Sequence, residues 1–136
     1  MLSIPLFYYP TTVVSIDDDP LFLKSLSQMM GPGYRQKSFN HPQKGMDFFD
    51  NYTSVLSKIA FLQEFVEHEY YDTVYHTPVD FDISNLIRLA DQPNRHDEVS
   101  VLIVDYTMPG INGIEICEKL DGHDFKKILL TGDADD

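Results

Sequence analysis

The sequence has little cysteine and few basic residues. One cysteine, Cys117, stands among 136 residues, which excludes an internal disulfide and a multi-cysteine metal cluster and fits a reducing compartment. Ten lysines and arginines stand against 22 aspartates and glutamates, and the formal net charge is −12. Because this charge repels phosphate backbones, we expect no direct binding of nucleic acid by this chain. The charge suits cation binding or docking on a basic surface of another protein.

Repeats, low-complexity tracts and membrane-length hydrophobic runs are absent too. The first ten residues, MLSIPLFYYP, are apolar, but no basic segment leads them and two prolines interrupt them. We therefore expect neither a signal peptide nor a membrane span, and a cytoplasmic location. With 43% hydrophobic and 24% charged residues, the composition is that of one soluble globular domain.

Strand patterns and helix patterns alternate along the chain. Runs of β-branched and apolar residues predict strands, and apolar residues at helical spacing predict helices. The predicted strands lie at 11–16, 34–39, 99–104 and 127–131, and the predicted helices at 21–30, about 41–52 and 113–120. This alternation predicts an α/β fold with a doubly wound parallel sheet.

The segment between the second and third strands is longer than a minimal unit requires. Asp17 and Asp105 are 105 − 17 = 88 positions apart, whereas a strand–helix–strand unit takes ~30 residues. The surplus lies at about 53–97 and contains two predicted helices, at 54–66 and 82–90. We interpret it as a helical insertion beside the second helix of a single domain, not as a second domain.

Polar residues follow three of the predicted strands. The first strand ends in Asp17, Asp18 and Asp19, the third ends at Asp105, and the fourth ends at Thr131. Because ligands of open parallel sheets bind at the carboxyl ends of the strands, we expect these groups to share a site. Crowded carboxylates repel one another, and an all-oxygen set favours Mg²⁺. Carboxylates, a cation and a hydroxyl together suggest phosphoryl transfer, in which an aspartate can be the nucleophile.

Three motifs occur in a characteristic order: IDDDP at 16–20, VDYTMPGING at 104–113 and ILLTG at 128–132. Together they resemble the receiver domain of two-component response regulators, whose fold is flavodoxin-like. The resemblance implies that Asp105 is the phosphoacceptor. It also implies an Mg²⁺ site, formed by Asp17, Asp18, Asp105 and the backbone carbonyl of Thr107, with Asp18 as a direct ligand and Asp17 acting through water.

The same resemblance assigns residues around the fourth strand and a function. Thr131 matches the switch hydroxyl, Gly132 matches the small residue that admits phosphate, and Asp133 and Thr107 match positions that tune dephosphorylation. The implied function is a phosphorylation-dependent signalling switch and not a metabolic enzyme. A sensor histidine kinase or phosphotransfer protein would donate the phosphoryl group, and an output domain or downstream protein would respond.

Two features depart from the family pattern. Receivers carry a lysine after a fifth strand, whereas this sequence stops at Asp136, and Lys126 and Lys127 precede the fourth strand. The catalytic lysine is therefore not in this chain, and we expect the chain to be a piece of a longer protein, truncated after the fourth strand. We hypothesise that the exposed sheet edge leads to a homodimer or to strand exchange. The second departure is the insertion.

Two other functions stay open. The first is an aspartate-nucleophile phosphatase of the haloacid dehalogenase type, with Asp17 as nucleophile and Asp19 as acid/base, which leaves the motif at Asp105 unexplained. The second is an interaction module that kept the receiver fold and lost phosphorylation. Asp19 could instead cap the following helix. The five histidines are scattered along the sequence, and we predict surface positions for them.

Overall fold

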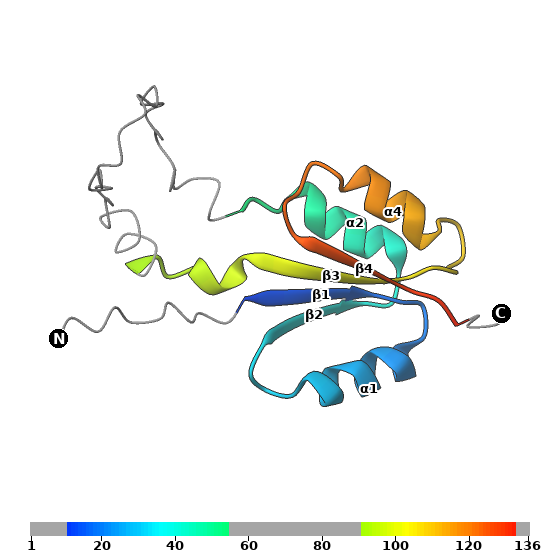
Figure 1. Ribbon diagram of the computed structural model, residues 1–136, viewed down its shortest axis with the longest axis horizontal. Helices are drawn as coiled ribbons and strands as arrows, with labels where there is room; N and C mark the ends of the chain where they lie inside the picture. Colours follow the sequence, from blue (N-terminus) through cyan, green and yellow to red (C-terminus); the bar gives the residue numbers. More distant parts are fainter. Residues whose placement is uncertain (1–10, 55–90, 133–136) are drawn as a thin grey trace, which may run out of the picture.

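The computed structural model describes residues 11–54 and 91–132. Four strands form one parallel sheet in the order β2–β1–β3–β4, with helices on both faces (Figure 1). The elements are β1 (Thr12–Ile16), α1 (Pro20–Met30), β2 (Arg35–Phe39), α2 (Pro42–Asp50), the 3₁₀ turn η2 (Arg95–Asp97), β3 (Val99–Asp105), α4 (Gly113–Lys119) and β4 (Lys126–Leu130). The predicted doubly wound α/β fold is confirmed, and each predicted strand is found within one residue or so of its expected position.

The two central strands, β1 and β3, carry the core of the sheet. Val14, Ile16, Leu102 and Val104 are completely buried. The central strands are apolar over most of their length because both of their faces are covered, as is usual for parallel sheets. The outer strands β2 and β4 are only partly buried.

Helix α1 lies on one face of the sheet, and α2 and α4 lie together on the other (Figure 1). The Asp19 carboxylate caps α1 by accepting hydrogen bonds from the amides of Leu21 and Phe22, at 2.8 and 3.3 Å. The prediction that Asp19 could be a cap is therefore confirmed. The helix ends at Gly31, whose φ of 69° is a left-handed conformation that glycine adopts without strain.

An aromatic cluster joins the end of α2 to the turn before β4. His123 stacks on Phe125 with ring centroids 5.2 Å apart, and it also contacts Phe49 and Tyr52. His123 is partly exposed, and its ring packs among these aromatic side chains. The turn after α4 carries it under the end of α2, a contact that no local pattern indicates. His68 and His76 lie outside the described residues.

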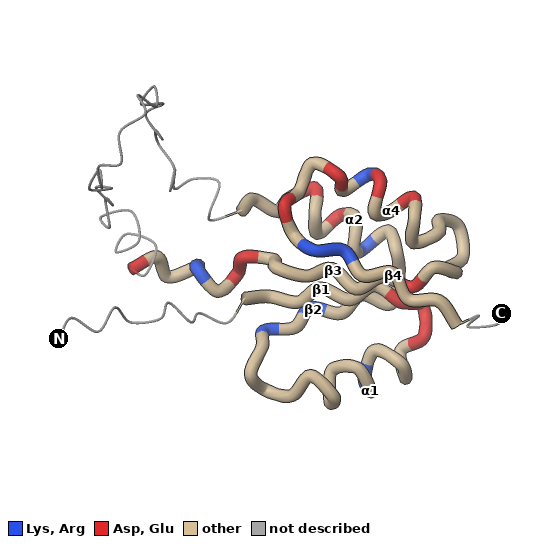
Figure 2. Tube along the Cα trace, viewed as in Figure 1, with Lys and Arg blue, Asp and Glu red and all other residues tan. Residues whose placement is uncertain are grey.

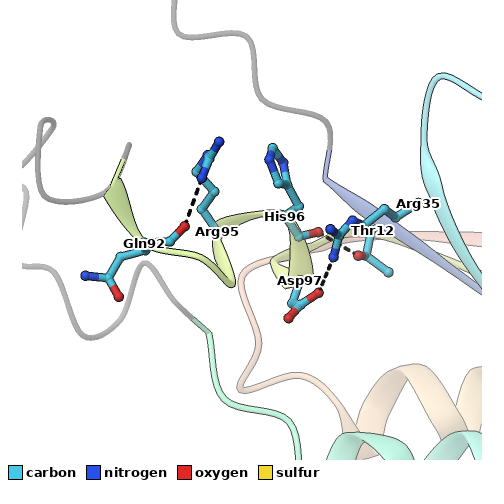
Figure 3. Close-up of polar contacts among 6 residues, drawn as sticks. All are labelled: Thr12, Arg35, Gln92, Arg95, His96 and Asp97. Carbon is cyan, nitrogen blue, oxygen red and sulfur yellow. Dashed lines mark hydrogen bonds and ion pairs between the residues drawn. The ribbon is translucent and has the colours of Figure 1, made fainter.

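Most of the predicted insertion, including nearly all of both its helices, lies outside the described residues. The chain returns to the sheet through η2, where the Thr12 hydroxyl donates to the His96 carbonyl at 2.8 Å and Arg35 pairs with Asp97 at 2.6 Å (Figure 3). Arg95 also donates to the Gln92 carbonyl at 3.0 Å. These contacts position the residues that lead into β3.

The two ends of the insertion meet directly. The Ser54 hydroxyl bonds the carboxylate of Glu98 at 2.7 Å, and the phenol oxygen of Tyr52 accepts a hydrogen bond from the amide of Val99 at 2.9 Å. Both contacts lie at the amino end of β3, whereas Asp105 ends the same strand at its carboxyl end. The insertion therefore leaves and rejoins the sheet at the edge opposite the predicted site.

Candidate metal and phosphoacceptor site

Three carboxylates from two neighbouring strands converge at the carboxyl edge of the sheet. Ile16 and Val104 are register partners in β1 and β3, so the residues that follow them, Asp17 and Asp105, lie side by side. Asp18 completes the group, and one carboxylate oxygen from each of the three residues lies within 4.8 Å of the others. The structure therefore brings together the acids that the sequence predicted, and their donor set fits a hard divalent cation.

Asp17 is the most enclosed member of this acid cluster. Its side chain is 8% exposed, and its carboxylate accepts a hydrogen bond from the amide of Asp19 at 2.8 Å. Burial raises the pKa of Asp17, the Asp19 amide lowers it, and the negative charges of Asp105, Asp18 and Asp19 raise it, so that the net shift is upward. A carboxylate destabilised by burial and by like charges is one that a bound cation would stabilise.

The three carboxylates of the acid cluster differ in their exposure to solvent. Asp105 is half-buried, and Asp18 is exposed. Among the described residues, the ion pair that the structure contains joins Arg35 to Asp97, at the other end of the sheet. No described lysine or arginine forms an ion pair with the acid cluster, so its negative charge is open to a cation.

Backbone contacts hold the end of β3 in place. The amide of Tyr106 donates to the carbonyl of Leu130 at 2.7 Å, and the amide of Gly113 donates to the carbonyl of Tyr106 at 3.0 Å. These bonds tie the residue after Asp105 to β4 on one side and to the start of α4 on the other. A conformational change at Asp105 can therefore displace both β4 and the start of α4.

The loop after Asp105 has an anchor that the sequence did not single out. Met108 is buried, with 7% of its surface exposed, and belongs to the main hydrophobic core. Gly110 follows with φ 90°, and the Asn112 side chain caps α4 by accepting from the Glu115 amide at 2.9 Å. The Met-Pro-Gly sequence thus fixes the loop by one buried side chain and one left-handed glycine. Met108 was the available signal in the sequence, because an apolar residue in a loop that would otherwise face solvent indicates burial.

The other predicted residues that the structure describes lie around the same edge. Asp105 and Leu130 are register partners, so Thr131, the next residue, follows β4 beside the acid cluster. Thr131, Gly132 and Thr107 are all exposed. Asp133 lies outside the described residues. The roles assigned to these four residues stay predictions.

Comparisons with known proteins support the fold. No family model matches the chain, and no curated protein matches it. Among solved structures, the chain is similar to the Legionella pneumophila response regulator LqsR, with a TM-score of 0.63 and 27% identity, over 95% of this chain and 33% of that one. The chain thus spans about a third of the length of that protein. The fold is flavodoxin-like and resembles that of a response regulator receiver.

Proposed function

We propose that this chain is a phosphorylation-dependent switch of two-component signalling. A sensor histidine kinase or a phosphotransfer protein donates the phosphoryl group, and Asp105 accepts it. The observation that carries this proposal is the convergence of Asp17, Asp18 and Asp105, with carboxylate oxygens within 4.8 Å, in a receiver-like fold. The protein acts as a signalling component in the cytoplasm and catalyses only its own phosphorylation and dephosphorylation.

The transfer needs little from the protein beyond position and charge. A carboxylate oxygen of Asp105 forms a bond to phosphorus, the phosphorus–nitrogen bond of the donor phosphohistidine breaks, and the imidazole nitrogen keeps the electron pair. Asp18, Asp105 and the Thr107 carbonyl would hold the Mg²⁺ ion directly, and Asp17 would hold it through water. When bound, Mg²⁺ neutralises the negative charge of the acid cluster and of the incoming phosphoryl oxygens.

The phosphoryl group adds negative charge at Asp105, next to a residue that is hydrogen-bonded to both β4 and α4. Tyr106 is bonded to β4 and to the start of α4, and Thr131 follows β4 beside Asp105. The hydroxyl of Thr131 responds to the phosphoryl oxygens, and the surface nearby shifts between two states. An output domain or a downstream protein recognises that change.

The test is chemical modification with a small donor. We expect acetyl phosphate with Mg²⁺ to add one phosphoryl group, measured by intact mass, and Asp105→Asn to abolish the addition. Asp121→Asn is the matched control, because Asp121 is an exposed acid after α4 and away from the acid cluster. Modification that survives Asp105→Asn would overturn the assignment of the acceptor.

The phosphatase alternative receives no support from the geometry. It requires Asp19 as the acid/base, but the Asp19 carboxylate accepts two amide hydrogen bonds at the start of α1. Phosphorylation mapped to Asp17 would favour that alternative. A chain that keeps its fold but takes up no phosphoryl group would favour the interaction module.

A further inference from the structure

Hydrogen bonds join the residues that precede and follow positions 55–90. The Ser54 hydroxyl donates to the Glu98 carboxylate at 2.7 Å, across 44 positions of the sequence. The Tyr52 hydroxyl accepts from the Val99 amide at 2.9 Å, across 47 positions. The two ends of this long stretch therefore meet side by side at the amino end of β3.

The first strand of the sheet holds the same place from the other side. The amide of Thr12 donates to the Glu98 carbonyl, and its hydroxyl donates to the His96 carbonyl, both at 2.8 Å. Arg35 of β2 pairs with Asp97 at 2.6 Å (Figure 3). We call the residues that close this junction the polar clasp: Thr12, Tyr52, Ser54, Glu98 and Val99.

The polar clasp is fixed by packing as well as by hydrogen bonds. Thr12 is 1% exposed, Val99 is 3% exposed, and even the charged residue Glu98 is only 8% exposed. A carboxylate buried to this depth needs hydrogen-bond donors, which favours the closed junction. The ring of Tyr52 contacts that of Phe49 edge-on, with centroids 6.0 Å apart. The clasp is therefore part of the folded core at this end of the sheet.

A β-bulge at Ser100 separates the polar clasp from the rest of β3. The register between β1 and β3 shifts by one residue between Val99 and Val101, so Ser100 has no counterpart in β1. Its hydroxyl shares a hydrogen bond of 2.5 Å with the Thr11 hydroxyl. A bulge interrupts the ladder and lets the strand bend locally. A displacement of the clasp can therefore be taken up at Ser100.

Beyond the bulge, β3 is held on both sides. From Val101 onward it pairs without interruption with β1 and with β4. A shift along the strand axis would have to break both ladders before it moved Asp105. The acid cluster lies at the carboxyl edge, where β1 and β3 end (Figure 2). Six positions, about 20 Å of strand, separate Val99 from Asp105.

We propose that the polar clasp and the bulge attach residues 55–90 to the sheet as a separate unit, so that the sheet and the acid cluster form without them. The clasp holds the two ends of this stretch together, and the bulge takes up displacements before they reach the continuous ladder. A partner that binds residues 55–90 then leaves the geometry at Asp105 unchanged. This inference does not depend on phosphorylation of Asp105.

Replacement of residues 55–90 tests whether the sheet forms without them. A linker of about twelve glycines and serines is flexible and reaches about 40 Å. The gap is shorter, because Ser54 contacts Glu98 and Asp91 lies seven positions before Glu98, about 25 Å at full extension. We expect the shortened chain to unfold cooperatively in denaturant and to keep the amide chemical shift of Val104.

A longer linker guards against strain from the linker itself. If the chain with the shorter linker does not fold but the chain with the longer linker does, the sheet still forms without residues 55–90. If neither chain folds, or if both fold with a changed amide shift at Val104, the proposal is overturned.

A variant of the clasp in the full chain tests the role of the bulge. Ser54→Ala removes the hydroxyl that bonds Glu98. We expect amide chemical shifts to change at Val99 and to stay the same at Val104 and Tyr106, on the other side of the bulge. Changes that extend to Val104 and Tyr106 would show that the bulge does not isolate the acid cluster.

Ser25→Ala is the matched control for this variant. The Ser25 hydroxyl donates to the Leu21 carbonyl within α1, at 3.0 Å, and is exposed. We expect its removal to leave the Val99 shift unchanged. An equal change at Val99 in both variants would contradict a specific role of the polar clasp.

Modification by acetyl phosphate separates this proposal from the phosphorylation proposal. We expect the shortened chain and the full chain to be modified at equal rates. If neither is modified while the chemical shifts behave as expected, the phosphorylation proposal fails and the separate attachment of residues 55–90 stands. If the full chain is modified and the folded shortened chain is not, the acceptor stands and the independence of the acid cluster from residues 55–90 is wrong.

Discussion

Gly113 lies directly against the main-chain carbonyl of Asp105. A Cβ atom at position 113 would meet both this carbonyl oxygen and the side chain of Leu129 at less than 3.0 Å, a separation that real Cβ atoms essentially never show. The glycine therefore allows the start of α4 to lie on the end of β3, beside the acid cluster. It also places α4 where a shift at Asp105 reaches it directly.

Replacing this glycine should disturb both stability and the site. We expect Gly113→Ala to lower the free energy of unfolding by about 1–3 kcal/mol, as overpacking of a close contact does, and to slow modification of Asp105. Chemical denaturation and intact mass after acetyl phosphate treatment measure the two effects. Gly122→Ala is the control, since a Cβ at position 122 has nothing within 4 Å. Equal behaviour of the two variants would contradict this account.

The sequence predicted the strands, their parallel arrangement and the acid cluster, because each depends on local patterns and on a general rule for parallel sheets. It did not predict contacts made by packing between distant segments. The stacking of His123 on Phe125 and the close approach of Gly113 to Asp105 depend on how α2 and α4 sit on the sheet. The spacing of apolar residues along the sequence does not predict such contacts.

The cap of α1 offers a test that separates stability from chemistry. Asp19→Ala removes the acceptor of two amide hydrogen bonds, and we expect it to lower stability by about 1 kcal/mol. Modification of Asp105 under folding conditions should be unchanged, because Asp19 lies outside the acid cluster. The phosphatase alternative expects the opposite, since Asp19 would be its acid/base. Loss of turnover with unchanged stability would therefore support the phosphatase.

Tyr52 should stabilise the point where the insertion joins the sheet. Its hydroxyl accepts from the Val99 amide, and burial and the charge of Glu98 raise the pKa of Tyr52 from its ordinary value of 10.0 to about 12. A raised pKa means that the neutral phenol stabilises the fold below pH 10 and that this contribution is lost as the pH rises toward 12. We expect Tyr52→Phe to cost about 1–3 kcal/mol, because it leaves a buried amide without its acceptor.

Denaturation of this variant at pH 7 and at high pH checks the prediction. The difference in stability between the wild-type chain and Tyr52→Phe should shrink as the phenol ionises. Tyr34→Phe is the matched control, since Tyr34 is 48% exposed, and it should change stability little at either pH. A Tyr52→Phe penalty that stays constant through this pH range would contradict the assigned role.

Asp17 should destabilise the metal-free fold and contribute to metal binding. Burial and neighbouring negative charges raise its pKa, so its protonated form favours folding, and this contribution is lost as the pH rises through the folded pKa. At neutral pH, where Asp17 is charged, we expect Asp17→Asn to raise the thermal stability of the metal-free protein.

Mg²⁺ should stabilise the wild-type chain by about 2.7 kcal/mol at 100 times its dissociation constant, and Asp17→Asn should lose most of that gain. Thermal unfolding with and without Mg²⁺ measures both effects, and Asp47→Asn, at an exposed acid on α2, should change neither. An Asp17→Asn chain that is less stable without Mg²⁺, yet gains as much from Mg²⁺ as the wild type, would show that Asp17 is a structural residue and not a ligand.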